Sequence, residues 1–146
     1  MAWIDARTVK LGCIGFSKKK STWNGALAAC KKANSNAHLI EIFNDNQARF
    51  LTSEKVRKQV RTHIGCDTYT CYGGSGYWWI GAELKSGVWY WPHSKKRVTY
   101  WSKIGGNGNN SKSYRYVMML LSRTTAYFHH YYDNNFNSIC QISINK

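Results

Sequence analysis

The chain has 146 residues, which suits one domain with a substantial core and excludes two large domains. Hydrophobic residues make up 43% of it and aromatic residues 15%, which excludes the apolar-poor composition of a disordered chain. The 21 Lys and Arg outnumber the seven Asp and Glu, and the formal net charge of +14 either favours anionic partners or simply keeps the protein soluble. We therefore predict a single domain over 1–146.

The sequence predicts neither a membrane span nor a secretory signal. Its longest uninterrupted apolar run, 116–121, is far shorter than the roughly 20 residues that a transmembrane helix needs. Asp5 and Arg7 lie where the apolar region of a secretory signal would have to be. We interpret 1–12 as an N-terminal extension of the domain.

A first helix is predicted directly after residue 22. Ser21 or Thr22 can cap its N-terminus, and Lys31 and Lys32 suit its last turn. Its apolar residues recur at helical spacing: Trp23, Ala26, Leu27 and Cys30.

A second helix is predicted after a mostly buried strand over 38–42. Asn44 or Asp45 can cap this helix, which we expect to run to about Val60. Its second half is crowded with charged residues, so we expect it to be largely solvated: Lys55, Arg57, Lys58 and Arg61.

From residue 76 onward the sequence changes to short aromatic strands separated by turn residues. The predicted strands are 77–81, 88–91, 98–101, 115–121, 126–132 and 138–144. The glycine-rich segments 72–76 and 105–110 are predicted to be loops. Helices followed by strands predict an α+β fold and argue against a doubly wound parallel sheet.

The number of cysteines, five, is odd. A bond between Cys30 and Cys140 would join the first helix to the last strand, and Cys66 and Cys71 are close enough in sequence for a local disulfide. Cys13 then remains, either for an interchain disulfide or as a buried free thiol. A zinc site on His63, Cys66 and Cys71 would lack a fourth ligand at customary spacing.

No sequence motif indicates an enzyme. The chain lacks Gly-x-Ser-x-Gly, His-Glu-x-x-His and the phosphate-binding Gly-x-x-x-x-Gly-Lys-Ser pattern. It also lacks any recognised nucleic-acid-binding motif. We assign no catalytic residue and no metal ligand, and we expect no nucleic-acid partner.

A series of short motifs spans the chain in order. Cys13-Ile-Gly-Phe16 precedes Thr22-Trp-Asn-Gly-Ala-Leu-Ala-Ala-Cys30, and Leu39-Ile40 leads to Trp79-Ile-Gly-Ala82. Gly87-Val-Trp-Tyr-Trp91, Val98-Thr-Tyr-Trp101, Tyr131-Tyr-Asp133 and Ile139-Cys-Gln141 follow. This series resembles the C-type lectin-like domain family, over nearly the whole chain.

The resemblance implies a double-looped α+β fold whose ends meet. It implies two helices, a mostly antiparallel strand-rich half, a disulfide between Cys30 and Cys140, and a long irregular ligand-binding loop between about residues 102 and 126. Large aromatic residues dominate buried area, so we expect Trp79, Trp89 and Trp91 in the core.

The sequence departs from the calcium-binding members that it resembles. Their Glu-Pro-Asn or Gln-Pro-Asp triplet is replaced by Asn107-Gly108-Asn109, and only Asn109 and Asp133 match the family's ligands in type. Calcium prefers about six to eight oxygen ligands, several of them commonly carboxylates, and Asp133 carries the only side-chain carboxylate after residue 83. We predict no cofactor, with calcium binding at most weakly. The second cysteine pair also looks absent, with Tyr116 and Phe136 near its expected positions.

The leading functional hypothesis is a lectin with little or no calcium dependence, suited to N-acetylated sugars on glycans or glycoproteins. Half of the aromatic run 127–132 should face outward from a strand, where ring faces suit the apolar face of a sugar. The predicted carbohydrate-binding residues are Asn107, Asn109, His129, Tyr132 and Asp133.

Two alternatives stay open. In the first, the domain has lost sugar binding and binds protein instead, with Cys13 available to link a homodimer. Otherwise it binds anionic or sulfated polysaccharide or a microbial surface through basic residues near the loop: Lys95, Lys96, Arg97, Lys103, Lys112 and Arg115. Disulfides persist outside the reducing cytosol, so we expect the protein to be secreted.

Overall fold

The computed structural model describes residues 1–71, 76–106 and 114–143. These residues form one 3-10 turn and three α-helices, η1 (Arg7–Val9), α1 (Trp23–Ala33), α2 (Asp45–Phe50) and α3 (Glu54–Ile64). The strands are β1 (Trp3–Asp5), β2 (Cys13–Phe16), β3 (Ala37–Leu39), β4 (Tyr77–Lys85), β5 (Val88–Trp91), β6 (Lys96–Arg97), β7 (Lys103–Ile104), β8 (Tyr116–Leu121), β9 (Ala126–Tyr131) and β10 (Asn137–Ile142). The predicted α+β class is confirmed. No helix in the described ranges is long and apolar enough to cross a membrane.

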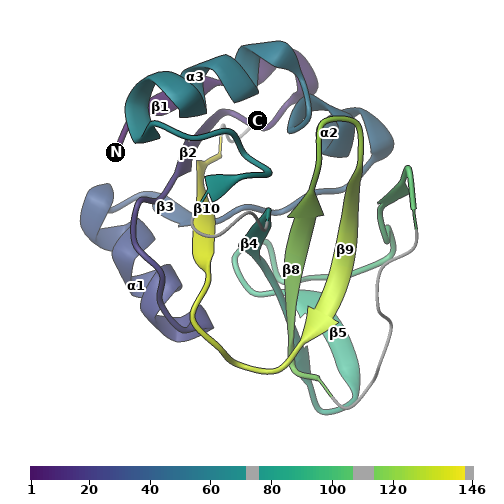
Figure 1. Cartoon of the computed structure of the whole chain (residues 1–146). Coiled ribbons are helices and arrows are strands. Elements are labelled where there is room, and N and C mark those ends of the chain that lie inside the picture. The colour runs from purple at the N-terminus through teal and green to yellow at the C-terminus, as the bar shows by residue number, and fades with distance from the viewer. Residues whose placement is uncertain (72–75, 107–113, 144–146) are drawn as a thin grey trace.

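The strands join in the order β1-β2-β10-β4-β8-β9-β7, with β3 added to β10 and the β5–β6 hairpin added to β4. Only β10 and β4 pair in parallel among these strands, so the predicted mostly antiparallel sheet is confirmed. β2, near the N-terminus, pairs with β10, near the C-terminus, so the two ends of the chain lie together (Figure 1). Figure 1 also shows α1 at the left of the molecule, α3 along its top and the β8–β9 hairpin at the right.

The helices begin at side-chain caps. The side-chain oxygens of Thr22, Asn44 and Ser53 accept hydrogen bonds from the backbone N–H groups of Gly25, Gln47 and Val56. The predicted first helix is confirmed.

The predicted single helix from 45 to about 60 is wrong, because the chain forms α2, a short turn and then α3. Ser53 caps a new helix after the turn, and α3 continues to Ile64, where Gly65 closes it with φ of 95°. The expected solvation of its second half is wrong in part, since Val56 and Val60 are buried and Arg57 is half-buried.

Most predicted strands are found, with shifted ends. The segment 98–101 is not a strand, although Val98 donates a backbone hydrogen bond to Trp89. β1 lies within the predicted N-terminal extension, and β7 was not predicted because two residues carry no periodicity. β4 continues past residue 81 because its last three residues pair with β5. Gly81 donates to the Ile40 carbonyl, and a Cβ there would come within 2.8 Å of the Leu39 oxygen.

Two clusters of buried side chains form the core. The larger packs α2, α3 and β2 against one face of the sheet, and the smaller lies between α1 and the opposite face of β4 and β8. Trp79 and Trp91 are fully buried, as predicted. Trp89 was also predicted in the core but is only half-buried, at the edge of the larger cluster. Trp101 is half-buried as well, and the rings of both residues pack on His130.

Candidate functional site

Strand β9 separates its side chains onto two faces. Ala126, Phe128 and His130 are buried, whereas Tyr127, His129 and Tyr131 are half-exposed. This alternation confirms that half of the aromatic run faces outward, as strand geometry requires. Pairing of β9 with β8 and of β8 with β4 places Tyr77 on the same outward face, across Leu120 from Tyr127.

Further rings from neighbouring segments join this face. Tyr131 has ring-centroid distances of 4.4 Å to Tyr132, 5.7 Å to Tyr114, 5.4 Å to Phe136 and 6.2 Å to His129. Tyr132 is 49% exposed, more than any other Phe, Tyr or Trp in the described residues. We call the following seven residues the aromatic surface: Tyr77, Tyr114, Tyr127, His129, Tyr131, Tyr132 and Phe136.

Hydrogen bonding and burial shift the pKa values of two side chains of this surface. The Tyr131 hydroxyl donates to that of Tyr132 at 3.5 Å, and this contact raises the pKa of Tyr131 to about 12. Burial lowers the pKa of His129, so its imidazole is neutral at pH 7, with one donor and one acceptor nitrogen. The surface therefore presents ring faces together with neutral hydrogen-bonding groups.

The predicted site residues Asn107 and Asn109 lie outside the described residues. The described residues on either side of them both contact the aromatic surface. Gly106 lies against Tyr127, so closely that a Cβ there would come within 2.8 Å of the ring, and Tyr114 packs on Tyr131 and Tyr132. Sequence reasoning did not single out Tyr114 or Tyr77, although Tyr114 lies within the long loop predicted between about residues 102 and 126.

Asp133 lies beside Tyr132 and also contacts α1. Its Oδ1 accepts a hydrogen bond of 3.0 Å from the backbone N–H of Trp23, the first residue of that helix. A carboxylate at a helix N-terminus is stabilised by the helix dipole. Asp133 therefore has a structural contact in addition to its predicted role in sugar binding.

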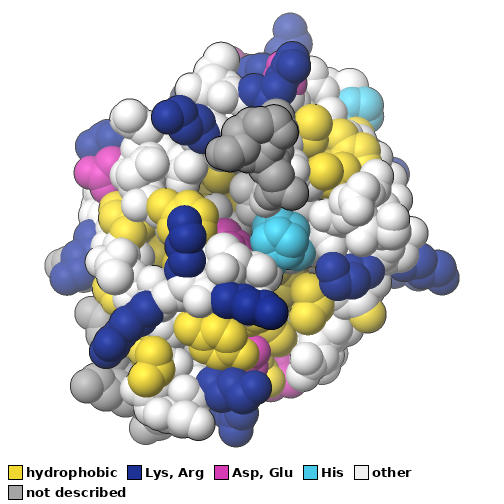
Figure 2. All heavy atoms as spheres, turned by 180° about the vertical axis from the view of Figure 1, so that it is seen from behind, with side chains coloured by type: hydrophobic (Ala, Val, Ile, Leu, Met, Phe, Trp, Pro, Cys, Tyr) yellow, Lys and Arg dark blue, Asp and Glu magenta, His cyan; other side chains and the backbone are white. Residues whose placement is uncertain are grey.

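The positive charge is spread widely over the molecule. Figure 2 shows Lys and Arg side chains scattered between apolar patches, with few acidic side chains among them. Ion pairs within the described ranges involve only Arg7, Arg57 and Arg61 among the basic residues. The described lysines therefore contribute an almost uncompensated positive potential.

Several solved structures resemble this chain over most of its length. The C-type lectin domain of murine dendritic cell inhibitory receptor 2, solved in complex with N-glycan, matches with a TM-score of 0.61 and 21% identity, over 90% of this chain and 91% of that one. Human lithostathine matches with a TM-score of 0.64 and 20% identity, over 90% and 83% of the two chains. The C-type lectin CEL-I from Cucumaria echinata matches with a TM-score of 0.58 and 17% identity, over 91% of each chain.

The chain has the C-type lectin fold. No family model and no curated protein matches its sequence. Identities of this size show a shared fold and leave the ligand open.

Within the C-type lectin fold, aromatic packing is found near the expected positions of the second cysteine pair. Tyr116 and Phe136 both pack on the buried ring of Trp79, at centroid distances of 6.0 and 5.1 Å. The Trp79 indole donates to the Ser21 carbonyl before α1. These contacts join β4, β8 and the segment before β10 without a covalent bond.

The cysteine predictions are confirmed for both disulfides, Cys30–Cys140 and Cys66–Cys71. Cys13 is a half-buried free thiol on β2. Because Cys66 and Cys71 are bonded to each other, the zinc hypothesis that used them with His63 is rejected.

The described residues do not fit the calcium centre of calcium-binding C-type lectins. They contain no group of three or more His, Cys, Asp or Glu side chains that could hold a metal ion. Asp133 also has one oxygen engaged by the Trp23 N–H. Since Asn107 and Asn109 lie outside the described ranges, weak or absent calcium binding stays a prediction.

Proposed function

We propose that this lectin-like domain binds carbohydrate through the aromatic surface, without requiring calcium, and favours N-acetylated sugars. The observation that supports this most directly is the group of outward rings on β9 and next to it. The two described residues that flank segment 107–113 both pack on rings of this group, Gly106 on Tyr127 and Tyr114 on Tyr131. Ring faces pack against the apolar face of a sugar, and the neutral His129 imidazole suits a hydroxyl or acetamido group. The second oxygen of Asp133, with Asn107 and Asn109, would accept or donate the remaining hydrogen bonds.

A glycan array in low and high salt tests the proposal. We expect selective binding to neutral N-acetylated glycans that survives high salt, because stacking and neutral hydrogen bonds are screened little. Each hydrogen bond contributes only about 1 kcal/mol net, so single sugars should bind weakly and clustered ones more tightly. No signal in either condition would contradict the proposal and favour a protein partner.

Two alanine variants, each removing a ring of similar solvent exposure, test whether binding depends on the aromatic surface or on any exposed ring. Tyr132→Ala should weaken glycan binding about three- to tenfold, the effect of losing one aromatic contact. Phe43→Ala removes a ring that is 40% exposed outside the aromatic surface, compared with 49% for Tyr132, and should leave binding unchanged. His129→Ala and Asp133→Ala should each weaken binding, and if both leave it intact the residue assignment is wrong.

Calcium dependence is tested by calorimetry with and without a chelator. We expect unchanged glycan affinity after chelation, since Asp133 carries the only side-chain carboxylate after residue 83. Loss of binding on chelation, or a calcium site tighter than millimolar, would contradict this part of the proposal.

A sulfated or otherwise anionic glycan is the second candidate ligand. It is favoured by the net charge of +14 and by the described lysines, which make no ion pair with a described acidic group. Binding would then be confined to anionic glycans on the array and would disappear at high salt.

We further propose that the protein is secreted and forms a disulfide-linked dimer through Cys13. The two disulfides support an oxidising compartment, and Cys13 is the thiol left over. Non-reducing electrophoresis should show a dimer that Cys13→Ser abolishes. A monomer that is unchanged by this substitution would remove the dimer proposal.

A further inference from the structure

A second candidate binding site lies among the helices. A groove of about 560 Å³ runs between α1 and α3 over the strands β1 and β2. Its apolar lining includes Ala2, Ile4, Phe16, Ala29, Val60 and Ile64. Ligand sites for small molecules have volumes of about 300–1,000 Å³, so this groove has the size of such a site.

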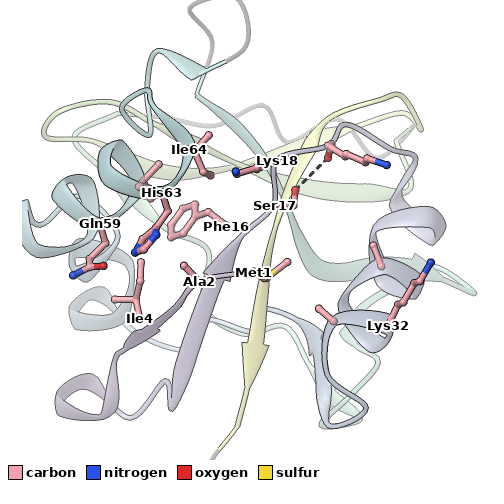
Figure 3. A pocket seen from close by; sticks show the side chains of 14 residues that line it. Met1, Ala2, Ile4, Phe16, Ser17, Lys18, Lys32, Gln59, His63 and Ile64 are labelled. Atoms are coloured by element: carbon pink, nitrogen blue, oxygen red, sulfur yellow. Dashed lines mark hydrogen bonds between the residues drawn. The ribbon is translucent and has the colours of Figure 1, made fainter.

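The shape of the groove follows from the residues of its walls. Ile4, Phe16 and Val60 form a floor that is continuous with the main core. On the α1 side the apolar part of the lining is Ala29 and Ala33, one helical turn apart, and such small side chains leave space where leucine would fill it. In Figure 3, Phe16 and Ala2 lie between Gln59 and His63 on α3 and Lys32 on α1.

The rim of the groove is cationic. Lys18, Lys19 and Lys32 supply this charge, and the lining contains no Asp or Glu. None of these three lysines pairs with an acidic group of the described residues. The segment that carries Lys18 and Lys19 is held in place because the Ser17 hydroxyl donates to the Lys19 carbonyl and accepts from the Ser138 N–H.

We propose that this groove binds a long-chain fatty acid. The acyl tail lies along Phe16, Ile4 and Val60, and the carboxylate pairs with the ammonium groups of Lys18, Lys19 or Lys32. An apolar bed with cations and no acids at its edge is complementary to a molecule with one apolar chain and one negative head. The site is independent of the aromatic surface, whose residues lie on β4, on β9 and in the segments before β8 and after β9.

Displacement of fluorescent dansyl-undecanoic acid measures the binding, with each competitor kept below its micelle concentration. Laurate, myristate and palmitate should displace the probe at one molecule per chain. Dodecanol has the same tail without the charge and should compete at least tenfold more weakly. Dodecyltrimethylammonium should compete least, and equal competition by this cation and by laurate would overturn the proposal.

Two pairs of matched variants locate the site. Ala29→Trp fills the groove, whereas Ala28→Trp places the same ring on the neighbouring exposed position of α1, outside the lining. The first should weaken probe binding at least tenfold and the second less than twofold. Lys18→Glu with Lys32→Glu should also weaken binding at least tenfold, and Lys58→Glu with Lys85→Glu, an equal charge change outside the groove, less than twofold.

Near-UV circular dichroism and the midpoint of urea unfolding verify that each variant is folded. Unchanged binding in Ala29→Trp, or equal losses in the two double lysine variants, would overturn the proposal. Binding to phosphatidylglycerol vesicles without displacement of the probe by laurate would also overturn it, because the groove would then belong to a membrane-binding surface. Glycan binding should be unaffected by laurate.

Discussion

His38 shows how burial alters the chemistry of a single side chain. It is 2% exposed, its Nδ1 donates to the Leu39 carbonyl, and its Nε2 accepts from the Ser143 hydroxyl. Its ring stacks on that of His93 at a centroid distance of 3.5 Å. Burial lowers the pKa of His38 to about 4, and the nearby His93 and Lys31 add to this effect.

We predict that this residue makes the domain less stable in mild acid. The folded pKa of about 4 lies below the ordinary value of 6.5, so the unfolded state binds the proton more tightly between these values. The contribution is fully present above pH 6.5 and is lost as the pH falls towards 4, on the order of 3 kcal/mol in the free energy of unfolding. Urea unfolding over this pH range should show a shallower fall in His38→Gln than in the wild type, and parallel curves would contradict the prediction.

Asp133 is expected to stabilise α1 as well as to bind sugar. Asp133→Asn removes the negative charge that accepts the Trp23 N–H, and should lower the free energy of unfolding by about 0.5–1 kcal/mol. Thr22→Ala removes the side-chain cap of the same helix and should cost about 1 kcal/mol, which gives a reference for this terminus. Unchanged stability in Asp133→Asn, measured by urea unfolding, would show that the contact has no structural role.

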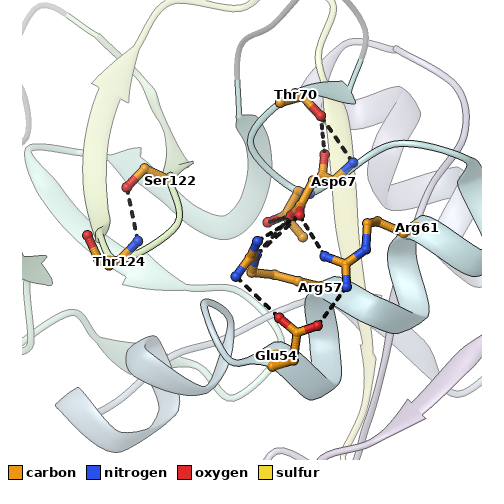
Figure 4. Close-up of polar contacts among 8 residues, drawn as sticks. Glu54, Arg57, Arg61, Asp67, Thr70, Ser122 and Thr124 are labelled. Atoms are coloured by element: carbon orange, nitrogen blue, oxygen red, sulfur yellow. Dashed lines mark hydrogen bonds and ion pairs between the residues drawn. The ribbon is translucent and has the colours of Figure 1, made fainter.

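At the scale of elements, α3 is joined to the following segment by a partly buried ion-pair network (Figure 4). Asp67 Oδ2 accepts from Arg57 at 3.0 Å and from Arg61 at 2.8 Å, while Glu54 contacts the same two arginines from the solvent side. Burial acts to raise the pKa of Asp67, but the hydrogen bonds from Arg57 and Arg61 outweigh it and lower that pKa. The side chain of Asp67 is 9% exposed and that of Glu54 is 67% exposed.

We predict that the two acids of this network differ strongly in their effect on stability. Asp67→Asn leaves Arg57 without its buried partner and should lower the free energy of unfolding by about 3 kcal/mol. Glu54→Gln removes a solvent-exposed carboxylate and should lower it far less. Chemical unfolding of the two variants measures the difference, and similar losses would contradict the prediction.

At the scale of the whole molecule, the two disulfides differ in the length of chain that they close. The sequence separation is 110 for Cys30–Cys140 and 5 for Cys66–Cys71. In the chain-entropy account, loss of the first should cost about 5 kcal/mol and loss of the second about 2 kcal/mol. Replacing each pair by Ser in a Cys13→Ser background prevents exchange with the free thiol, and calorimetric unfolding measures both costs. A larger loss from the short loop would contradict this account.

Much of the fold follows from residues close together in the sequence. The cap at Thr22 and the helical spacing of Trp23 and Cys30 predicted α1, and alternation predicted that one alternate set of the β9 rings faces outward. Helix and strand periodicity depend on neighbours a few positions away, so these features could be predicted without a structure.

The remaining features depend on residues far apart in the sequence. α2 and α3 separate at a turn whose flanking residues pack into the core, and Tyr77 and Tyr114 join the aromatic surface through strand pairing and ring contacts. Asp133 meets α1 across 110 positions, and the cationic groove combines β2 with two helices. No local pattern predicts such contacts, because they exist only once packing of the whole chain has brought the elements together.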